Sequence, residues 1–131
     1  MDLLEYFENA RGTGVLATAD GQGQVNVAVY ARPHVMQDGT LVFIMADRLT
    51  RRNVEQNPHA AYLFLQDGAE RAGIRLSLTK VGESTDPDLI AQLRRRRYSP
   101  EDESGMGTLR LVYFAVEHQR PLVGSLSEAS G

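Results

Sequence analysis

The sequence contains no cysteine, and no apolar run approaches the roughly 20 residues that a transmembrane helix requires. The absence of cysteine excludes a disulfide framework, thiol catalysis and a cysteine-ligated metal site. The first residues are acidic, where a secretory signal peptide would be basic. We therefore expect a cytoplasmic protein that does not associate with membranes.

Basic residues are also scarce, with 14 Lys and Arg against 17 Asp and Glu, which gives a formal net charge of −3. A mildly acidic chain is a poor match for phosphate backbones, so we expect no nucleic-acid partner. The 131 residues and the hydrophobic content of 42% suit one domain with its own core. We expect this domain to span residues 1–118 and residues 119–131 to form a C-terminal tail.

Six apolar runs have the length and pattern of β-strands. They are residues 15–19, 24–32, 40–46, 60–66, 74–81 and 109–116. The runs at 40–46 and 60–66 are almost entirely apolar, so we expect both to be buried on two faces. Residues 74–81 alternate, which places Ile74, Leu76 and Leu78 inward. A mainly β (α+β) fold follows.

Three Asp-Gly pairs separate these runs, at Asp20-Gly21, Asp38-Gly39 and Asp67-Gly68. Asp-Gly between apolar runs is a hairpin signal, because both residues tolerate the positive φ of tight turns. When the segment 48–58 is left out, the pairs are evenly spaced. This spacing favours a β-meander with one inserted helix over a parallel, dinucleotide-binding sheet.

Helical patterns occur at residues 2–11 and 86–97, with Thr85 or Asp86 as the cap of the latter. Four consecutive arginines, at residues 94–97, fall in its last turn, where cations complement the helix dipole. Contact with a partner subunit is the alternative for them. The even strand count and the regular hairpins favour a small six-stranded barrel with two or three short helices.

A positive island interrupts the acidic chain at Asp47-Arg48-Leu49-Thr50-Arg51-Arg52-Asn53-Val54-Glu55-Gln56-Asn57-Pro58. It follows an apolar run, and Thr50 is a good N-cap for a helix that Pro58 ends. Cations at a helix N-terminus are unfavourable unless an anion compensates, and guanidinium groups match phosphate. The island therefore indicates a phosphate site, and the alternative is a surface helix with solvated arginines.

The second strand carries Asn26, Ala28 and Tyr30 on one face and valines 25, 27 and 29 on the other. We expect the first row to line a slot for a flat polar ligand and the valines to fill the core. The alternative is a polar row on a half-exposed strand. The three histidines lack metal-ligand spacing and no serine has a nucleophile context, so we expect no metal and assign no catalytic residue.

These segments, in this order, resemble the FMN-binding split barrels related to pyridoxamine 5′-phosphate oxidase. The residues that carry the resemblance are 14–18, 24–30 and 41–46, the island 48–58, and 60–64. The resemblance extends over about residues 3–118 and implies a six-stranded antiparallel split barrel. It also implies a homodimer with one FMN per subunit at the interface. The apolar runs 40–46 and 109–116 suit that interface, because so small a barrel cannot bury them alone.

The resemblance also implies which residues hold the flavin. The phosphate would be held at the head of the island helix by Arg48, Thr50 and Arg51, with Leu49 in the same turn and Asn53 or Arg52 less directly involved. Many relatives have Lys at the position of Thr50, so the positive charge would come from the arginines. Asn26, the backbone of Val27, and Ala28 would contact the ring.

The chain is much shorter than true pyridoxamine phosphate oxidases and lacks their C-terminal motif, so we do not expect that substrate. The implied function is an FMN-dependent oxidoreductase that transfers hydride or electrons. One alternative is a non-catalytic binding module for deazaflavin, haem or stored flavin. Another is a structural dimer with an empty cleft.

Overall fold

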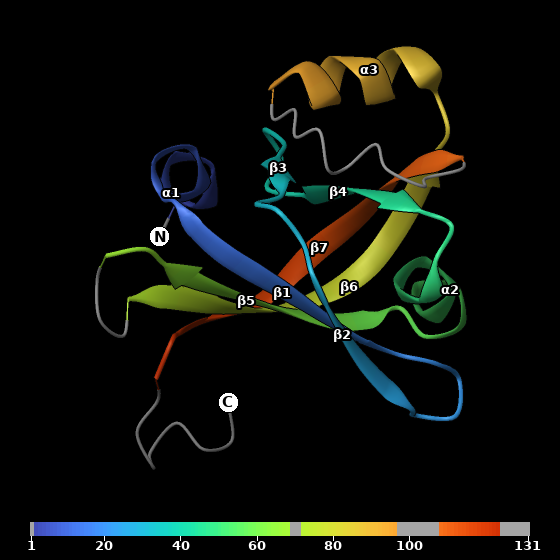
Figure 1. The fold of residues 1–131 in the computed structure, drawn as a ribbon, viewed down its shortest axis with the longest axis horizontal. Helices are drawn as coiled ribbons and strands as arrows, with labels where there is room; N and C mark the ends of the chain where they lie inside the picture. Colours follow the sequence, from blue (N-terminus) through green and yellow to red (C-terminus); the bar gives the residue numbers. More distant parts are fainter. Residues whose placement is uncertain (1, 69–71, 97–107, 124–131) are drawn as a thin grey trace.

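The computed structural model describes residues 2–68, 72–96 and 108–123, which form one antiparallel sheet and its flanking helices (Figure 1). The helices are α1 (Leu3–Asn9), α2 (Leu49–Gln56) and α3 (Pro87–Arg96). The strands are β1 (Gly12–Ala19), β2 (Val25–Val29), β3 (His34–Val35), β4 (Leu41–Ala46), β5 (His59–Gln66), β6 (Gly73–Ser84) and β7 (Leu109–Pro121).

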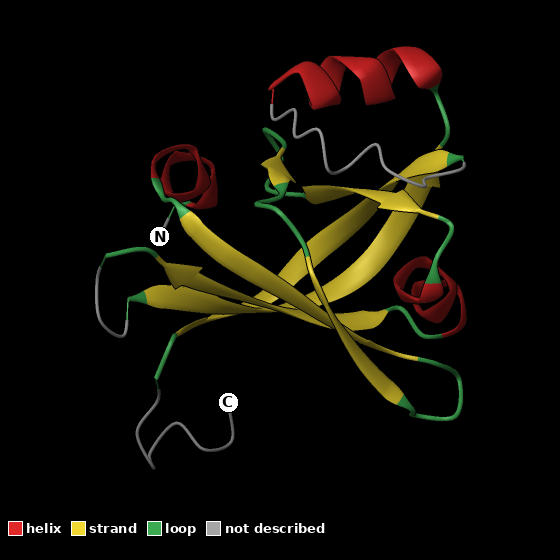
Figure 2. Cartoon of the chain, viewed as in Figure 1, coloured by secondary structure: helices red, strands yellow, loops and turns green. Residues whose placement is uncertain are grey.

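The strand order in the sheet is β2-β1-β5-β6-β7-β4-β3, and every neighbouring pair is antiparallel. Figure 2 shows the strands as one curled sheet with the three helices outside it. β1 and β4, each the second strand from one end of the sheet, contribute side chains to the same core, as a barrel requires. The expected mainly β, antiparallel fold is confirmed. The seventh strand is β3, whose two residues are too short to leave a pattern in the sequence.

All three Asp-Gly pairs lie in hairpins, which join β1 to β2, β3 to β4 and β5 to β6. Gly39 and Gly68 adopt the expected positive φ, of 88° and 73°, whereas the first hairpin has its positive φ at Gly23. The predicted meander is wrong, because β4 pairs with β7 and β5 returns to pair with β1. The spacing of the turns predicts which strands form hairpins, but it does not predict how the strands of different hairpins pair with one another.

The core is built around a cluster of aromatic rings. Phe7 of α1 meets Phe64 edge-on at 5.5 Å between ring centroids, and Phe43 meets Phe114 in the same way at 5.8 Å. Leu3 and Phe7 are the buried residues of α1, which Asp2 caps by accepting hydrogen bonds from the backbone N–H groups of Leu4 and Glu5. Edge-to-face pairs of this kind add about 0.5–1.5 kcal/mol each beyond the area that they bury.

The β4 strand is buried on both faces, as predicted, but a helix rather than a second subunit covers its outer face. Val42 of β4 and Leu111 of β7 pack against Ile90 and Leu93 of α3. Asp86 caps this helix by accepting hydrogen bonds from the backbone N–H groups of the following turn. The argument that strands 40–46 and 109–116 need a dimer partner is therefore wrong.

The β5 and β2 strands also depart from expectation. β5 alternates, with Tyr62 and Phe64 buried and Leu65 exposed, so it is not buried on both faces. In β2 the valines face outward, with exposed fractions of 83% for Val25, 67% for Val27 and 76% for Val29.

Register explains which face of β2 points inward. Asn26 is paired with Thr18 and Ala28 with Leu16, and both β1 residues are buried. Paired residues share a face of the sheet, so the row of Asn26 and Ala28 points inward and the valines do not fill the core. The outward valine row continues across the register into Val15 of β1 and Leu63 of β5.

Candidate functional site

The head of α2 lies directly after β4 and carries the positive island that the sequence singles out. The helix begins at Leu49 with Arg48 as its N-cap residue, two residues before the predicted cap, and no side chain caps it. Its first backbone bond runs from the N–H of Arg52 to the carbonyl of Arg48, at 3.0 Å. The N–H groups of the first turn therefore point out of the helix, where they and the helix dipole attract anions.

Tyr30 joins this head to the end of β2. Its side chain makes a hydrogen bond with the side chain of Thr50. It also lies close enough to Arg48 for the guanidinium charge to lower the pKa of its phenol. The ring meets Phe43 edge-on, with centroids 5.8 Å apart. The two parts of the predicted site, the inner row of β2 and the head of the island helix, therefore meet at Tyr30 and Thr50.

The backbone of Tyr30 is held as firmly as its ring. Its N–H donates to the carbonyl of Gly14 at 3.0 Å, and its carbonyl accepts from the hydroxyl of Tyr62 at 3.1 Å. Burial raises the pKa of Tyr30 above its ordinary value, although the hydrogen bond with Thr50 and the charge of Arg48 act in the opposite direction. Tyr30 is therefore a neutral phenol at pH 7.

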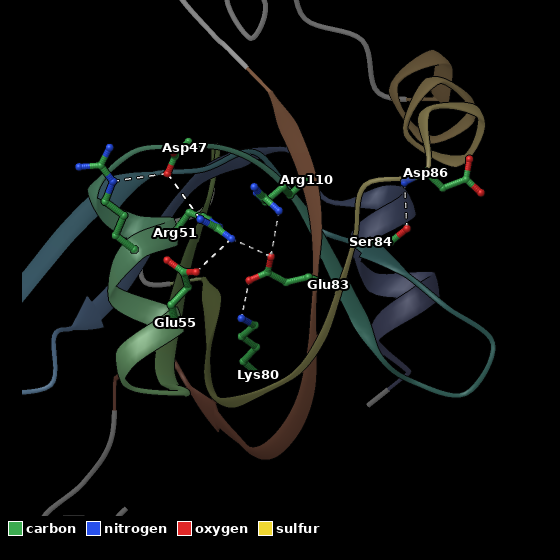
Figure 3. A network of polar contacts seen from close by, with 9 residues as sticks. Asp47, Arg51, Glu55, Lys80, Glu83, Ser84, Asp86 and Arg110 are labelled. Atoms are coloured by element: carbon green, nitrogen blue, oxygen red, sulfur yellow. Dashed lines mark hydrogen bonds and ion pairs between the residues drawn. The ribbon is translucent and has the colours of Figure 1, made fainter.

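Arg51 points away from the head of α2 and into a cluster of charges (Figure 3). This ion cluster consists of Asp47, Arg51, Glu55, Lys80, Glu83 and Arg110. Arg51 Nη2 lies 3.2 Å from both Glu55 Oε2 and Glu83 Oε1, and Nη1 lies 3.6 Å from Asp47 Oδ1. Three carboxylates therefore neutralise the charge of Arg51, whose side chain is only 11% exposed.

Glu83 is the centre of the ion cluster, because it contacts three cations from three elements. It accepts hydrogen bonds from Lys80 and Arg51, and Arg110 Nη1 lies 3.9 Å from its Oε1. Burial alone would raise the pKa of Glu83, but the bonds from Lys80 and Arg51 hold it below its ordinary value. The ion cluster therefore attaches α2 to β6 and β7.

Asn53 also faces the interior and not the head of the helix. It is 3% exposed, and its amide Nδ2 donates to the hydroxyl of Thr18 at 3.0 Å. This buried bond holds α2 against β1. Arg52, in contrast, is exposed, and its ion pair with Asp47 lies at the surface.

The structure thus separates the predicted site residues into three groups. Arg48, Leu49 and Thr50 lie at the head of α2, with the side chains of Arg48 and Leu49 exposed. Asn26 and Ala28 are half-buried on the inner face of β2, whereas the side chain of Val27 faces outward. Arg51 and Asn53 hold the helix to the sheet.

The sequence placed Tyr30 in the row that we expected to line the ligand slot, but it did not link Tyr30 to the head of α2. The signal was present, since a row that contains Asn26 and Ala28 must also carry Tyr30 two residues on. Glu83, Lys80 and Arg110 were missed altogether. Nothing in the sequence indicates that Glu83 would reach Arg51, or that Lys80 and Arg110 would gather around Glu83.

Within residues 2–68, 72–96 and 108–123, no three His, Asp or Glu side chains are grouped so that they could hold a metal ion. No helix of the described part has the length and apolar character needed to cross a membrane.

The family model for pyridoxamine 5′-phosphate oxidase matches residues 2–121 of the chain. No curated protein sequence matches it. Among solved structures, an FMN-binding protein from Syntrophomonas wolfei subsp. wolfei superposes with a TM-score of 0.75 at 17% identity, covering 95% of this chain and 88% of that one.

Two other solved structures share the fold. An F420 reductase has a TM-score of 0.72 at 16% identity and covers 89% of this chain and 95% of its own. The heme storage protein HutZ from Vibrio cholerae has a TM-score of 0.65 at 26% identity, with coverages of 89% and 90%. One fold therefore serves proteins that are named for three different ligands.

Proposed function

The chain belongs to the pyridoxamine 5′-phosphate oxidase family, and from this premise we propose that it is an FMN-binding flavoprotein that transfers hydride or electrons. The observation that carries the proposal is the head of α2, where outward backbone N–H groups stand beside Thr50 and Arg48. Backbone N–H, hydroxyl and guanidinium groups are the donors that phosphate monoesters prefer. The residues present therefore fit a flavin phosphate.

Within this proposal, Arg48 supplies the charge, Thr50 a hydroxyl, and Leu49 and its neighbours their backbone N–H groups. The guanidinium of Arg51 is held by carboxylates, so we propose that it orients α2 and does not bind the phosphate directly. Asn53 acts in the same way through its bond to Thr18. Arg48 then provides the positive charge for the phosphate at the head of the helix.

We propose that the ring lies along β2, with Asn26, the backbone of Val27 and Ala28 as its contacts. β2 is an edge strand that pairs only with β1 among the described strands, so its other backbone edge can offer donors and acceptors. Bound FMN would supply the redox chemistry, while the chain supplies binding, orientation and electrostatics.

The proposal includes a homodimer, but with a different contact face from the one that the sequence suggested. α3 covers the outer face of β4 and β7, whereas the outward valine row of β2 is exposed. This row, with Val15, Ala17 and Leu63 beside it, contains no charged residue. Cores of homodimer interfaces are likewise apolar and depleted of charge, so we assign the subunit contact to this face.

The phosphate site is tested by comparing the affinities of FMN and riboflavin, which differ only in the phosphate. Arg48→Ala should weaken FMN binding by about ten- to a hundredfold, because a charge-assisted hydrogen bond contributes about 1.5–3 kcal/mol. Riboflavin binding should not change. Arg52→Ala is the matched control, since Arg52 is exposed and pairs only with Asp47 in the described structure.

The ring contacts are tested separately with Ala28→Leu. The added bulk should weaken FMN and riboflavin alike, because it acts on the part that the two ligands share. Titrations with F420 and with haem complete the series. If either ligand binds more tightly than FMN, the chain is a binding module of the alternative kind and the proposal fails.

A further inference from the structure

We infer that the outer face of β6 and β7 carries an anion site for the phosphate group of a phosphate monoester, built from Arg75, Ser77, His118 and Arg120. None of these residues lies on α2 or β2, so the site stands apart from the proposed flavin contacts. Three observations support it: the register of the two strands, the charge around the arginines, and the bonds that hold their side chains.

The register of β6 and β7 brings the four side chains together. Arg75 is the direct cross-strand partner of Arg120, and Ser77 is the partner of His118. The buried core residues of β6 alternate with Arg75 and Ser77, so these two face outward. Paired residues share a face of the sheet, and the Cβ atoms of direct partners are about 4.5–5.5 Å apart. The four side chains therefore form one group on the outer face.

The charge of Arg75 and Arg120 is not balanced by the described part of the chain. Like charges directly opposite each other in a sheet are destabilising. Within the described residues, neither of these arginines makes an ion pair. In contrast, Arg51 and Arg110 lie 3.2 and 3.9 Å from Glu83 Oε1. Two neighbouring cations without a carboxylate break a local rule, and a bound anion would compensate for them.

Neutral oxygen atoms hold both guanidinium groups without cancelling their charge. Arg75 Nε donates to the carbonyl of Pro121 at 2.8 Å, and Arg120 Nη1 donates to the hydroxyl of Ser77 at 3.1 Å. A guanidinium has five N–H donors, so each arginine retains four beyond this bond. Both residues are also partly buried. Donors that are already held in place lose less conformational entropy when a ligand binds.

The donors of this group match a phosphate monoester. Two guanidinium groups balance its two negative charges, and each can bind two of its oxygens at once. Ser77 accepts from Arg120, which leaves the hydroxyl proton of Ser77 to donate. His118 is exposed opposite Ser77 and adds an imidazole N–H. Neither register pair contains an acidic residue that would repel the ligand.

The test is a titration of the full chain with inorganic phosphate, followed through the imidazole signals of His118 by NMR. His118→Gln identifies these signals by their loss. We expect the His118 signals to shift with saturation while those of His59, which is exposed on β5, stay in place. Sodium chloride at the same ionic strength should not reproduce the shift.

Variants of the two arginines locate the binding. Arg75→Gln and Arg120→Gln should each weaken phosphate binding by about tenfold or more, because each removes charge-assisted hydrogen bonds. Arg11→Gln is the matched control, since it removes the same charge at an exposed position between α1 and β1. It should leave the affinity within about twofold of the parent value.

Three results would overturn the phosphate site on β6 and β7. The His118 signals of the parent protein could stay in place when phosphate is added, or move equally with chloride. They could also move with the same affinity in both arginine variants. If they stay in place and the arginine variants lose a dimer in sedimentation, the two arginines contact carboxylates of a partner subunit instead.

A competition with flavin separates this site from the proposed function. If FMN binds without displacing inorganic phosphate from the His118 signals, the two sites are independent, as we expect. If FMN displaces the phosphate and riboflavin does not, the outer face of β6 and β7 holds the flavin phosphate. The phosphate site is then supported, and the assignment of the flavin phosphate to the head of α2 fails.

Discussion

Two regions of the sheet carry apolar side chains that face outward, but in the described structure only one of these regions is covered. On β4 and β7, α3 covers the outer face with Ile90 and Leu93. On the edge strand β2, the valine row stays exposed. The ion cluster also attaches β6 and β7 to α2, whereas the outward face of β2 bears only apolar side chains.

This difference shows that an apolar run in the sequence indicates a surface that must be buried. The run does not indicate whether the same chain or a partner subunit buries that surface. The chain covers the β4 and β7 face itself, so substitutions there should act on folding. The β2 face has no cover in the described part of the chain, so substitutions there should act on assembly.

The largest effect is expected at Leu111, which is fully buried between β7 and α3. Leu111→Asp places an unpaired carboxylate there and should cost more than about 4 kcal/mol, comparable to the whole stability of a small domain. Circular dichroism should show an unfolded chain. Leu111→Met keeps the volume and should remain folded, and a folded Leu111→Asp would remove the distinction between the two faces.

A smaller loss is expected when the cover itself is weakened. Leu93→Ala in α3 removes buried methyl groups from the same cluster and should destabilise the protein by about 2–4 kcal/mol. Urea unfolding measures this change. Gln92→Ala, at an exposed position of the same helix, should leave the midpoint unchanged. Equal effects of the two variants would mean that α3 does not seal this face.

The ion cluster should contribute less than the apolar cover. Glu83→Gln leaves Lys80, Arg51 and Arg110 without their shared carboxylate and should cost about 1–3 kcal/mol at pH 7. Glu55→Gln, at an exposed carboxylate that contacts only Arg51 in the described structure, should cost less. Denaturant midpoints of the two variants and the parent provide the comparison.

The pH dependence of this effect has a defined sign. The pKa of Glu83 is lower in the folded protein than its ordinary value of 4.5, so its contribution is present above that value. The contribution is lost as the pH falls through the folded pKa. The gap in stability between the parent and Glu83→Gln should therefore shrink below about pH 4.5. A gap that widened in acid would contradict this reading of the ion cluster.

The smallest effect on folding is expected at the exposed face. Val27→Asp should change the stability of the monomer by less than about 1 kcal/mol, since Val27 is 67% exposed and packs against no core. It should nevertheless abolish the proposed dimer. Sedimentation of the parent should give about twice the 14.5 kDa chain mass, and that of the variant the chain mass alone. Val27→Ile is the control that should keep the dimer.

Local chemistry made much of this molecule predictable. The three Asp-Gly hairpins and the cap of α3 were expected from residues a few positions apart, and each is confirmed. The fold class and the family resemblance were also predicted correctly. These features depend on neighbours in the chain, whose spacing the sequence shows directly.

One error comes from the period of two, which marks the two faces of a strand but does not say which face is inward. In β2 the larger apolar side chains face outward, because the register with Thr18 and Leu16 selects the other row. Other errors come from contacts between distant residues. The sequence showed Arg51 near a helix head, but not the strand residue Glu83 that binds it.

Propensity, turn chemistry and capping act over a few residues, so the sequence alone was enough to locate six of the seven strands, the three Asp-Gly hairpins and the helix that carries the positive island. The pairing of the hairpin edges, the packing of α3 on β4 and β7, and the contact between Tyr30 and Thr50 became known only from the folded structure. These outcomes depend on contacts between residues that lie far apart along the chain. Burial and register select such contacts only when the whole sheet has closed around one core.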